Sequence, residues 1–225
     1  MKSLWPLEGA LSTLPIAGKS LQDWVQEGVL TEEELAAISY SWSFLELHEQ
    51  LLQRVRKNGS TYLECSIAQL AKDACLLVGE GTQVLPGVYV EGLVVVGENC
   101  KIGPNCYLRG PISIGEDCHV GQGVELKNTI LGNGTNVGHL SYIGDSVLAN
   151  KVNLGAGTIT SNLRHDGQNH RSVVDGEIID TGRRKFGTVI GDGVHTGIHT
   201  SLYPGRKLGP GTTTLPGEVV SRDKH

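Results

Sequence analysis

The sequence predicts an all-β protein, in which a parallel β-helix follows a short helical segment. Three observations lead to this prediction. From residue 78 onward aliphatic residues recur at every sixth position, which matches neither the 3.6-residue period of a helix nor the two-residue alternation of a strand. Glycine supplies 31 of the 225 residues, whereas aromatic residues supply only 5%. An amphipathic helical pattern is confined to residues 1 to about 74.

Residues 1–74 form the predicted N-terminal helical segment. Residues 21–28, LQDWVQEG, are typical of a short helix that a glycine closes. Thr31 and Glu34 have the spacing of a capping box, and apolar residues then follow at near-helical spacing until the pattern ends at Asn58-Gly59. The segment is too short to form a domain alone, so we expect it to dock on the β-helix, where it could cover the open end.

Residues 75–225 carry the six-residue repeat. Eight consecutive steps of six run from Val78 to Leu126, and a glycine often follows the aliphatic residue. Two steps of five interrupt the series, at 126–131 and at 143–148. One coil of such short strands cannot bury its own apolar face, so coils must stack and bury it together. We therefore predict one β-helix domain over this range.

Residues 161–189 break the repeat inside this domain. They carry five of the 19 Lys and Arg residues of the chain. We predict that they form a loop ejected from the coils. Long loops on a rigid scaffold commonly carry function.

Composition and charge exclude several functions. The net charge is −5 and no basic tract is present, so nucleic acid is not expected as a partner. No run of about 18 apolar residues predicts a membrane span, and the first residues do not resemble a signal peptide, so we expect a cytoplasmic protein. The five cysteines form no C-x-x-C pair, and the spacing of His195 and His199 within the repeat does not put both on one face, so no metal site is predicted.

The six-residue pattern resembles the hexapeptide repeat of the left-handed β-helix acyltransferases. The resemblance covers residues 78–160 and 190–220. It implies a left-handed β-helix in which three hexapeptides make up each coil. Cys100 and Cys118 are three hexapeptides apart, so they would lie one above the other, which favours a packing role for these thiols.

Longer strings make the resemblance more specific. GHLSYIGD at 138–145 and NLGAGTITSN at 153–162 closely resemble the acetyltransferase half of bifunctional glucosamine-1-phosphate N-acetyltransferase/N-acetylglucosamine-1-phosphate uridyltransferase. SWSFLELHEQLL at 41–52 and TGRRKFGTVIGDGVHTGIHTSLYPGRKLG at 181–209 resemble the archaeal-type branch. No nucleotide-binding loop of the G-x-G-T-R type is recognisable, so the nucleotidyltransferase domain is not expected, nor is uridylyl transfer.

The resemblance implies an activity and an assembly. The activity is transfer of acetyl from acetyl-CoA to the amine of an amino-sugar phosphate, with glucosamine 1-phosphate as the first choice of acceptor, in UDP-GlcNAc biosynthesis. The assembly is a homotrimer with sites between subunits. The family's general base corresponds to His139. Its sugar-phosphate-binding residues correspond to Arg109, Lys127, Tyr142, Asn153 and Asn162, and a backbone contact to acetyl-CoA falls near Ala156.

The chemistry of acetyl transfer accounts for these residue types. An ammonium group must lose a proton before it can attack a thioester, and a histidine is suited to accept that proton. Glu125 is a candidate for holding the imidazole of His139 in one tautomer. Arg109 and Lys127 are separated by the length of one coil, so they should stack on one face and bind the phosphate. For the CoA phosphates the ejected loop offers Arg183, Arg184 and Lys185.

Other interpretations stay open at this point. The acceptor could be another amino sugar or a nucleotide-linked sugar, with the ejected loop setting the choice. The protein could instead be a non-catalytic trimeric scaffold that binds sugar phosphates, with or without a separate nucleotidyltransferase partner. Taken singly, His139 could be a surface histidine, and the cations of the loop could simply be solvated. Binding of CoA would favour an enzyme over the scaffold.

Overall fold

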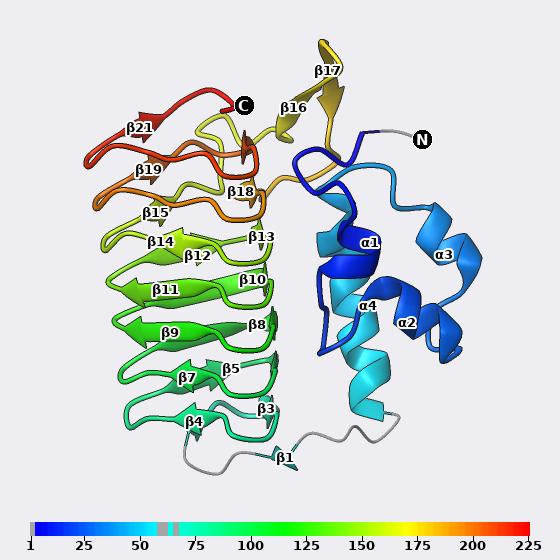
Figure 1. The fold of residues 1–225 in the computed structure, drawn as a ribbon, viewed down its shortest axis with the longest axis vertical. Helices are drawn as coiled ribbons and strands as arrows, with labels where there is room; N and C mark the ends of the chain where they lie inside the picture. Colours follow the sequence, from blue (N-terminus) through cyan, green and yellow to red (C-terminus); the bar gives the residue numbers. More distant parts are fainter. Residues whose placement is uncertain (1–2, 58–62, 65–67) are drawn as a thin grey trace.

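The computed structural model describes residues 3–57, 63–64 and 68–225. Figure 1 shows a column of stacked coils, a group of helices along one flank and a hairpin that projects beyond the coils. The helices are α1 Ala10–Thr13, α2 Leu21–Gln26, α3 Glu32–Ala36 and α4 Ser43–Lys57. The strands are β1 Leu63–Glu64, β2 Gln69–Leu70, β3 Cys75–Val78, β4 Gln83–Val84, β5 Tyr89–Glu91, β6 Leu93–Val96, β7 Lys101–Ile102, β8 Tyr107–Ile114, β9 His119–Gln122, β10 Glu125–Leu131, β11 Asn136–His139, β12 Tyr142–Gly144, β13 Val147–Leu148, β14 Asn153–Leu154, β15 Ile159–Thr160, β16 Arg171–Val174, β17 Glu177–Asp180, β18 Thr188–Ile190, β19 Ser201–Leu202, β20 Arg206–Leu208 and β21 Val219–Val220.

The coils form the left-handed parallel β-helix that the repeat predicts. Lys101 pairs with His119, which lies three hexapeptides further on, as the expected coil length requires. His119 then pairs with Asn136, and Asn136 pairs with Asn153. Both of these later spacings are one residue short of three hexapeptides, because each coil contains one of the five-residue steps. Each such step therefore shortens one coil and leaves the stacking intact.

The coils have three faces. The five-stranded face consists of β4, β7, β9, β11 and β14. The long strands β8 and β10 bend round a corner, so their first halves and their second halves belong to different faces. The network face comprises β2, β5, the first halves of β8 and β10, β12, β15, β19 and β21. The helix-covered face comprises β3, β6, the second halves of β8 and β10, β13, β18 and β20.

The interior of the coils is a column of aliphatic side chains from all three faces. The six-residue series supplies it, and residues such as Ile102, Leu108 and Val120 are completely buried. Cys100 and Cys118 stack as expected, because the backbone N–H of Cys118 lies 3.3 Å from Sγ of Cys100. Both thiols are buried and belong to the core of the coils.

The helical segment lies along the flank of the coils and does not cover their open end (Figure 1). The expectation of an end cap was therefore wrong. The reason is that the helix-covered face presents apolar side chains outward, among them Val95, Ile130, Val147 and Val189. The apolar side of α4 packs against them and buries both surfaces.

The helical segment is divided by local capping signals. Thr31 and Glu34 form the predicted capping box at the start of α3, and Ser20 and Asp23 form a second one at the start of α2. The helical pattern is interrupted between α3 and α4. Its predicted end at Asn58-Gly59 lies outside the described residues. Among the described residues, no helix combines the length and apolar character that crossing a membrane requires.

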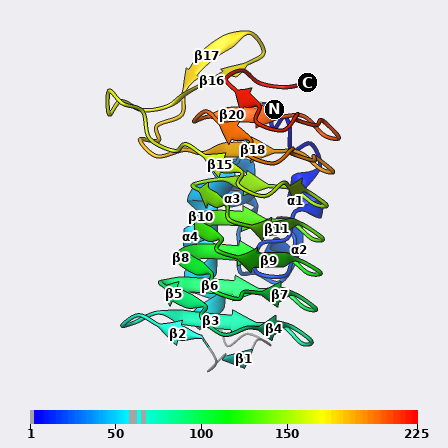
Figure 2. The same ribbon diagram turned by 90° about the vertical axis from the view of Figure 1, so that its left-hand side faces the viewer.

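The ejected segment leaves the coils after β15 and returns at β18. Its antiparallel pair β16–β17 projects beyond the last coils, as both views show (Figures 1 and 2). Phe186 lies near the return point, is fully buried and contacts the ring of Trp42 from the helical segment at a centroid distance of 6.1 Å. The base of the ejected segment is thus joined to the helices as well as to the coils.

His48 on α4 predicts a pH-dependent stability. Its side chain is fully buried, and neither ring nitrogen has a hydrogen-bond partner within the described part of the chain. Burial lowers the pKa of His48 from 6.5 to about 3. As the pH falls below about 6.5 the unfolded chain binds a proton that the folded chain does not accept until about pH 3, so stability should fall across this window. His48→Leu should make thermal unfolding less dependent on pH between about 4.5 and 7.5, and an unchanged slope would contradict this.

Phe186→Ala should destabilise the junction between helices and coils. The substitution leaves a cavity beside Trp42 and should lower the free energy of unfolding by about 3–5 kcal/mol, measured by urea denaturation. Ile178→Ala is the matched control, because Ile178 on β17 is 68% exposed and its truncation should change stability by no more than about 0.5 kcal/mol. Equal effects of the two substitutions would contradict the anchoring role.

Candidate functional site

Three of the predicted site residues lie in adjacent coils of the network face. Arg109 on β8 pairs in register with Lys127 on β10, as their spacing predicts. The guanidinium of Arg109 donates to the carboxylate of Glu125 at 2.9 Å, and its Nε lies 3.8 Å from Glu91. The hydrogen bond to Glu125 raises the pKa of Arg109. Arg109 is therefore a fixed cation, flanked by two carboxylates.

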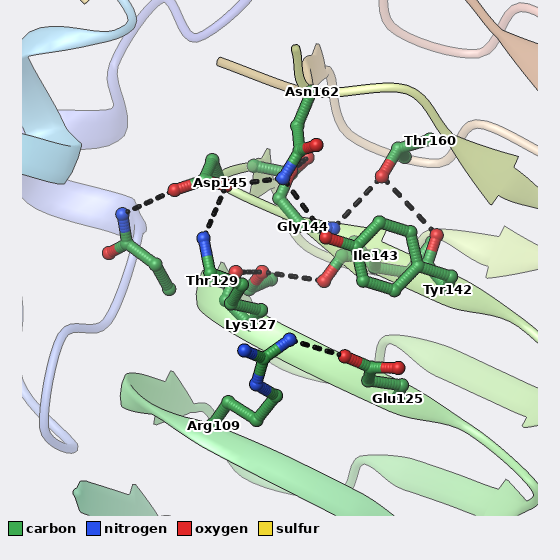
Figure 3. A network of polar contacts seen from close by, with 12 residues as sticks. Arg109, Glu125, Lys127, Thr129, Tyr142, Ile143, Gly144, Asp145, Thr160 and Asn162 are labelled. Carbon is green, nitrogen blue, oxygen red and sulfur yellow. Dashed lines mark hydrogen bonds and ion pairs between the residues drawn. The ribbon is translucent and has the colours of Figure 1, made fainter. Parts of the chain in front are cut away.

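A second group surrounds Asp145, at the corner where the network face meets the helix-covered face (Figure 3). Lys127 Nζ lies 3.0 Å from Asp145 Oδ2, and Asn162 Nδ2 donates to the same oxygen at 2.6 Å. Asn162 Nδ2 also donates to the hydroxyl of Tyr142 at 2.9 Å. The structure thus brings Lys127, Tyr142 and Asn162 together, from three separate turns of the chain.

Tyr142 is half-buried within this group. Burial raises the pKa of its phenol, and the carboxylates of Asp145 and Glu125 act in the same direction. The hydroxyl therefore keeps its proton. It accepts a hydrogen bond from Asn162 and can still donate one to an oxygen of a ligand.

His139 and Asn153 belong to the five-stranded face and not to the network face. Both are exposed. His139 ends β11 and pairs with Gln122, whereas Glu125 pairs with Tyr142, so His139 and Glu125 lie on opposite sides of one corner in adjacent coils. No hydrogen bond joins their side chains in the described residues, and Glu125 is paired with Arg109 instead.

The residues predicted for acetyl-CoA lie apart from one another. The carbonyl of Ala156, one coil above His139, accepts from the N–H of His199 at 2.8 Å. Arg184 and Lys185 are exposed. Arg183 is partly buried, and burial lowers its pKa against the attraction of Asp145 and of Glu46 and Glu49 on α4. Arg183 thus faces carboxylates of the protein, so it is less suited than its two neighbours to bind a phosphate.

Asp145 is the polar residue that the sequence analysis missed. It is the last residue of the string GHLSYIGD and lies within the second five-residue step of the repeat. Asn128 occupies the corresponding shortened corner one coil below, and both residues adopt positive φ, 46° for Asn128 and 50° for Asp145. The two shortened steps were the signal in the sequence that could have revealed Asp145. Each step holds an Asn or an Asp, and these are the non-glycine residues that tolerate positive φ best.

The family comparison matches the GMPPB C-terminal domain over residues 87–204, which is more than half of the chain. The chain belongs to the GMPPB C-terminal domain family. The matched range contains every predicted site residue, and it begins and ends within the coils.

Curated relatives of this GMPPB C-terminal domain protein are bifunctional. A sugar-1-phosphate nucleotidylyltransferase/acetyltransferase of Sulfurisphaera tokodaii is 47% identical over 100 residues, which cover 44% of this chain and 25% of the relative. The bifunctional protein GlmU of Methanococcus aeolicus is 33% identical over 187 residues, which cover 83% of this chain and 44% of the relative. The chain therefore spans less than half of either relative.

Among solved structures, a Bacillus cereus protein assigned as an acetyltransferase is 19% identical to this chain. The superposition covers 67% of this chain and 76% of that protein, with a TM-score of 0.39. A structural likeness at this level gives no information about the function of the chain.

Lys127→Met should destabilise the fold, because it leaves the carboxylate of Asp145 buried without its cation. The Asp145 side chain is only 4% exposed and that of Lys127 is 20% exposed, so the loss should be about 3 kcal/mol. Arg109→Met is the matched control. Its ion pair with Glu125 has side chains 37% and 33% exposed, and removal should cost about 0–1 kcal/mol. Chemical denaturation of both variants measures the two losses of stability. Equal losses would contradict the larger contribution of the buried pair of Lys127 and Asp145.

Proposed function

We propose that the protein is an acetyl-CoA-dependent N-acetyltransferase that acts on an amino-sugar phosphate, with glucosamine 1-phosphate as the first acceptor to test. One observation carries this proposal. Arg109, Lys127 and Tyr142 lie on the network face, Asn162 is bonded to Tyr142, and His139 lies across the far corner of that face, in a chain related to bifunctional sugar-1-phosphate nucleotidylyltransferase/acetyltransferases.

The acceptor would bind through its phosphate and its hydroxyl groups. Arg109 offers a planar fork of donors and Lys127 a point charge, and both project from neighbouring coils. Both cations are already paired with carboxylates, so a phosphate must share them or displace Glu125 from Arg109. Displacement would release Glu125 toward the corner that carries His139. Tyr142, Asn162 and Asn153 would orient the sugar hydroxyls and the amine.

His139 would act as the general base. It would take a proton from the ammonium of the acceptor, and the nitrogen lone pair would then attack the carbonyl carbon of the acetyl thioester. The C–S bond breaks when the tetrahedral intermediate collapses, and the proton on the imidazolium passes to the departing thiolate of CoA. The nitrogen, which is still protonated after the attack, loses its second proton to water and so becomes the neutral amide. A backbone N–H near Ala156 would stabilise the oxyanion of that intermediate. The exposed Arg184 and Lys185 would attract the CoA phosphates. The partly buried Arg183 would contribute less to this attraction.

A homotrimer with sites between subunits accounts for the exposed apolar residues beside His139. Leu140, Ile198 and Leu215 lie along the corner between the five-stranded face and the network face, and they are 66%, 51% and 74% exposed. An aligned apolar edge of this kind is typical of a subunit contact. A second subunit seated there would also cover the exposed His139. We propose in addition that residues 75–225 form the catalytic domain and that residues 1–74 stabilise it.

A nucleotide-linked amino sugar is the second candidate acceptor. A cavity of about 470 Å³ lies at the start of the ejected segment. It combines the ring of Tyr203 with Leu163 and Arg164, so it offers an apolar surface for a base and one guanidinium, now paired with Asp166, for a phosphate. Ser161 and Leu163, which line it, flank Asn162 in the sequence.

His139→Ala should abolish thiol release from acetyl-CoA in the presence of glucosamine 1-phosphate. Loss of a general base should lower kcat by about 100-fold or more, because the amine then depends on water to remove its proton. His119→Ala is the matched control, since His119 lies on the same five-stranded face and has no role in the proposed reaction. It should retain the wild-type rate.

Other outcomes distinguish the alternatives. Release with an amino-nucleotide sugar, but not with glucosamine 1-phosphate, would select the second acceptor. Equal rates for wild type and His139→Ala would reject His139 as the base. Failure of the folded wild-type protein to bind CoA or to acetylate any amino sugar would reject the enzyme in favour of a binding scaffold.

A further inference from the structure

Asp145 joins more parts of the polar network than any other residue in Figure 3. Its carboxylate accepts hydrogen bonds from the side chains of Lys127, Asn128 and Asn162, at 3.0, 3.0 and 2.6 Å. Its side chain is 4% exposed. A carboxylate this buried is tolerated only where donors and a cation satisfy it, and here both its oxygens are occupied.

The backbone of Asp145 fixes the surroundings of the same group. Its N–H donates to the carbonyl of Lys127 at 2.7 Å, and its carbonyl accepts from the N–H of Gly187 at 2.8 Å. Asn162 lies where the ejected segment leaves the coils, and Gly187 lies where it returns. Asp145 is therefore bonded to both ends of that segment and to the coil below.

The shortened corner explains why aspartate suits this position. Two residues, Gly110 and Pro111, turn the corner in the coil of Arg109, whereas Asn128 alone lies opposite them in the next coil. Asp145 follows in the third coil, with φ at 50°. Its short side chain folds back over the corner and reaches donors from the coil below and from the ejected segment.

We propose that Asp145 is a positioning residue for the acceptor site: it holds Lys127 and Asn162 in the orientation that binds the sugar phosphate, without contacting the substrate itself. This inference rests on the proposed function. Lys127 has three donor hydrogens, and the bond to Asp145 fixes one of them, so the other two point in defined directions. Asn162 gives one Nδ2 to both Asp145 and Tyr142, which also fixes the hydroxyl of Tyr142.

Asp145→Asn tests the proposal. Asparagine has the same size and tolerates the same φ, but its amide offers one acceptor oxygen in place of two and turns a donor toward the donors of Lys127 or Asn162. The KM for the acceptor should rise about tenfold, whereas the KM for acetyl-CoA should stay unchanged, because the lost bonds orient only acceptor-binding groups. In a Lys127→Met background the same substitution should have a much smaller effect on the acceptor KM.

Asp117→Asn is the matched control. Asp117 also lies at a corner with positive φ, at 54°, but it is exposed. The control should change neither KM. If Asp145→Asn lowers the melting temperature but leaves the acceptor KM at the wild-type value, Asp145 only braces the corner and the proposal is overturned.

Crystal structures of wild type and Asp145→Asn separate this inference from the proposed function. Lys127 and Asn162 should leave their wild-type positions in the variant. If they keep those positions, the positioning role is overturned whatever the reaction is. If the wild type acetylates no amino sugar but the two side chains move, the proposed function fails and the positioning role of Asp145 stands.

Discussion

The close stacking of the coils is the constraint on which the rest of the structure depends. A Cβ atom at Gly97 would lie 2.7 Å from the backbone of Gly115, and one at Gly121 would lie 1.9 Å from the carbonyl oxygen of Gly138. Real Cβ atoms do not approach backbone this closely, so these corners require glycine. Coils this close together stack in a defined register. That register brings Arg109 beside Lys127 and sets His139 across a corner from Glu125.

The site is electrostatically satisfied before any ligand binds. Arg109 is held by Glu125 and Lys127 by Asp145, but the two pairs differ in exposure. The pair of Arg109 is partly solvated, so a phosphate can exchange with its carboxylate at little cost. The pair of Lys127 is buried, and breaking it would strand a charge. In the proposed function, Arg109 would therefore be the cation that changes partner when the phosphate binds, whereas Lys127 would bind the phosphate without leaving Asp145.

The sequence predicted the coils well because their signal is local and repeated. The six-residue period and the two five-residue steps together determine which residues stack, including Cys100 on Cys118. The position of the helical segment could not be predicted in this way, since an amphipathic helix shows that it has an apolar side but not what that side covers. The run Leu93–Val96 was the available signal, because four consecutive apolar residues in a strand are buried on both faces. Asp145 was missed because its partners come from another coil and from the ejected segment.

The helical segment connects to the site through the base of the ejected segment. Trp42 packs on Phe186, and Glu46 and Glu49 of α4 attract the partly buried Arg183, which also faces Asp145. Asp145 in turn holds Lys127 and Asn162. The packing of Trp42 on Phe186 and the charge interactions of Arg183 thus link the helical segment to Asp145, which holds two side chains of the proposed acceptor site. The N-terminal segment therefore buries the apolar outer surface of the coils and also places two carboxylates that attract Arg183 at the base of the ejected segment.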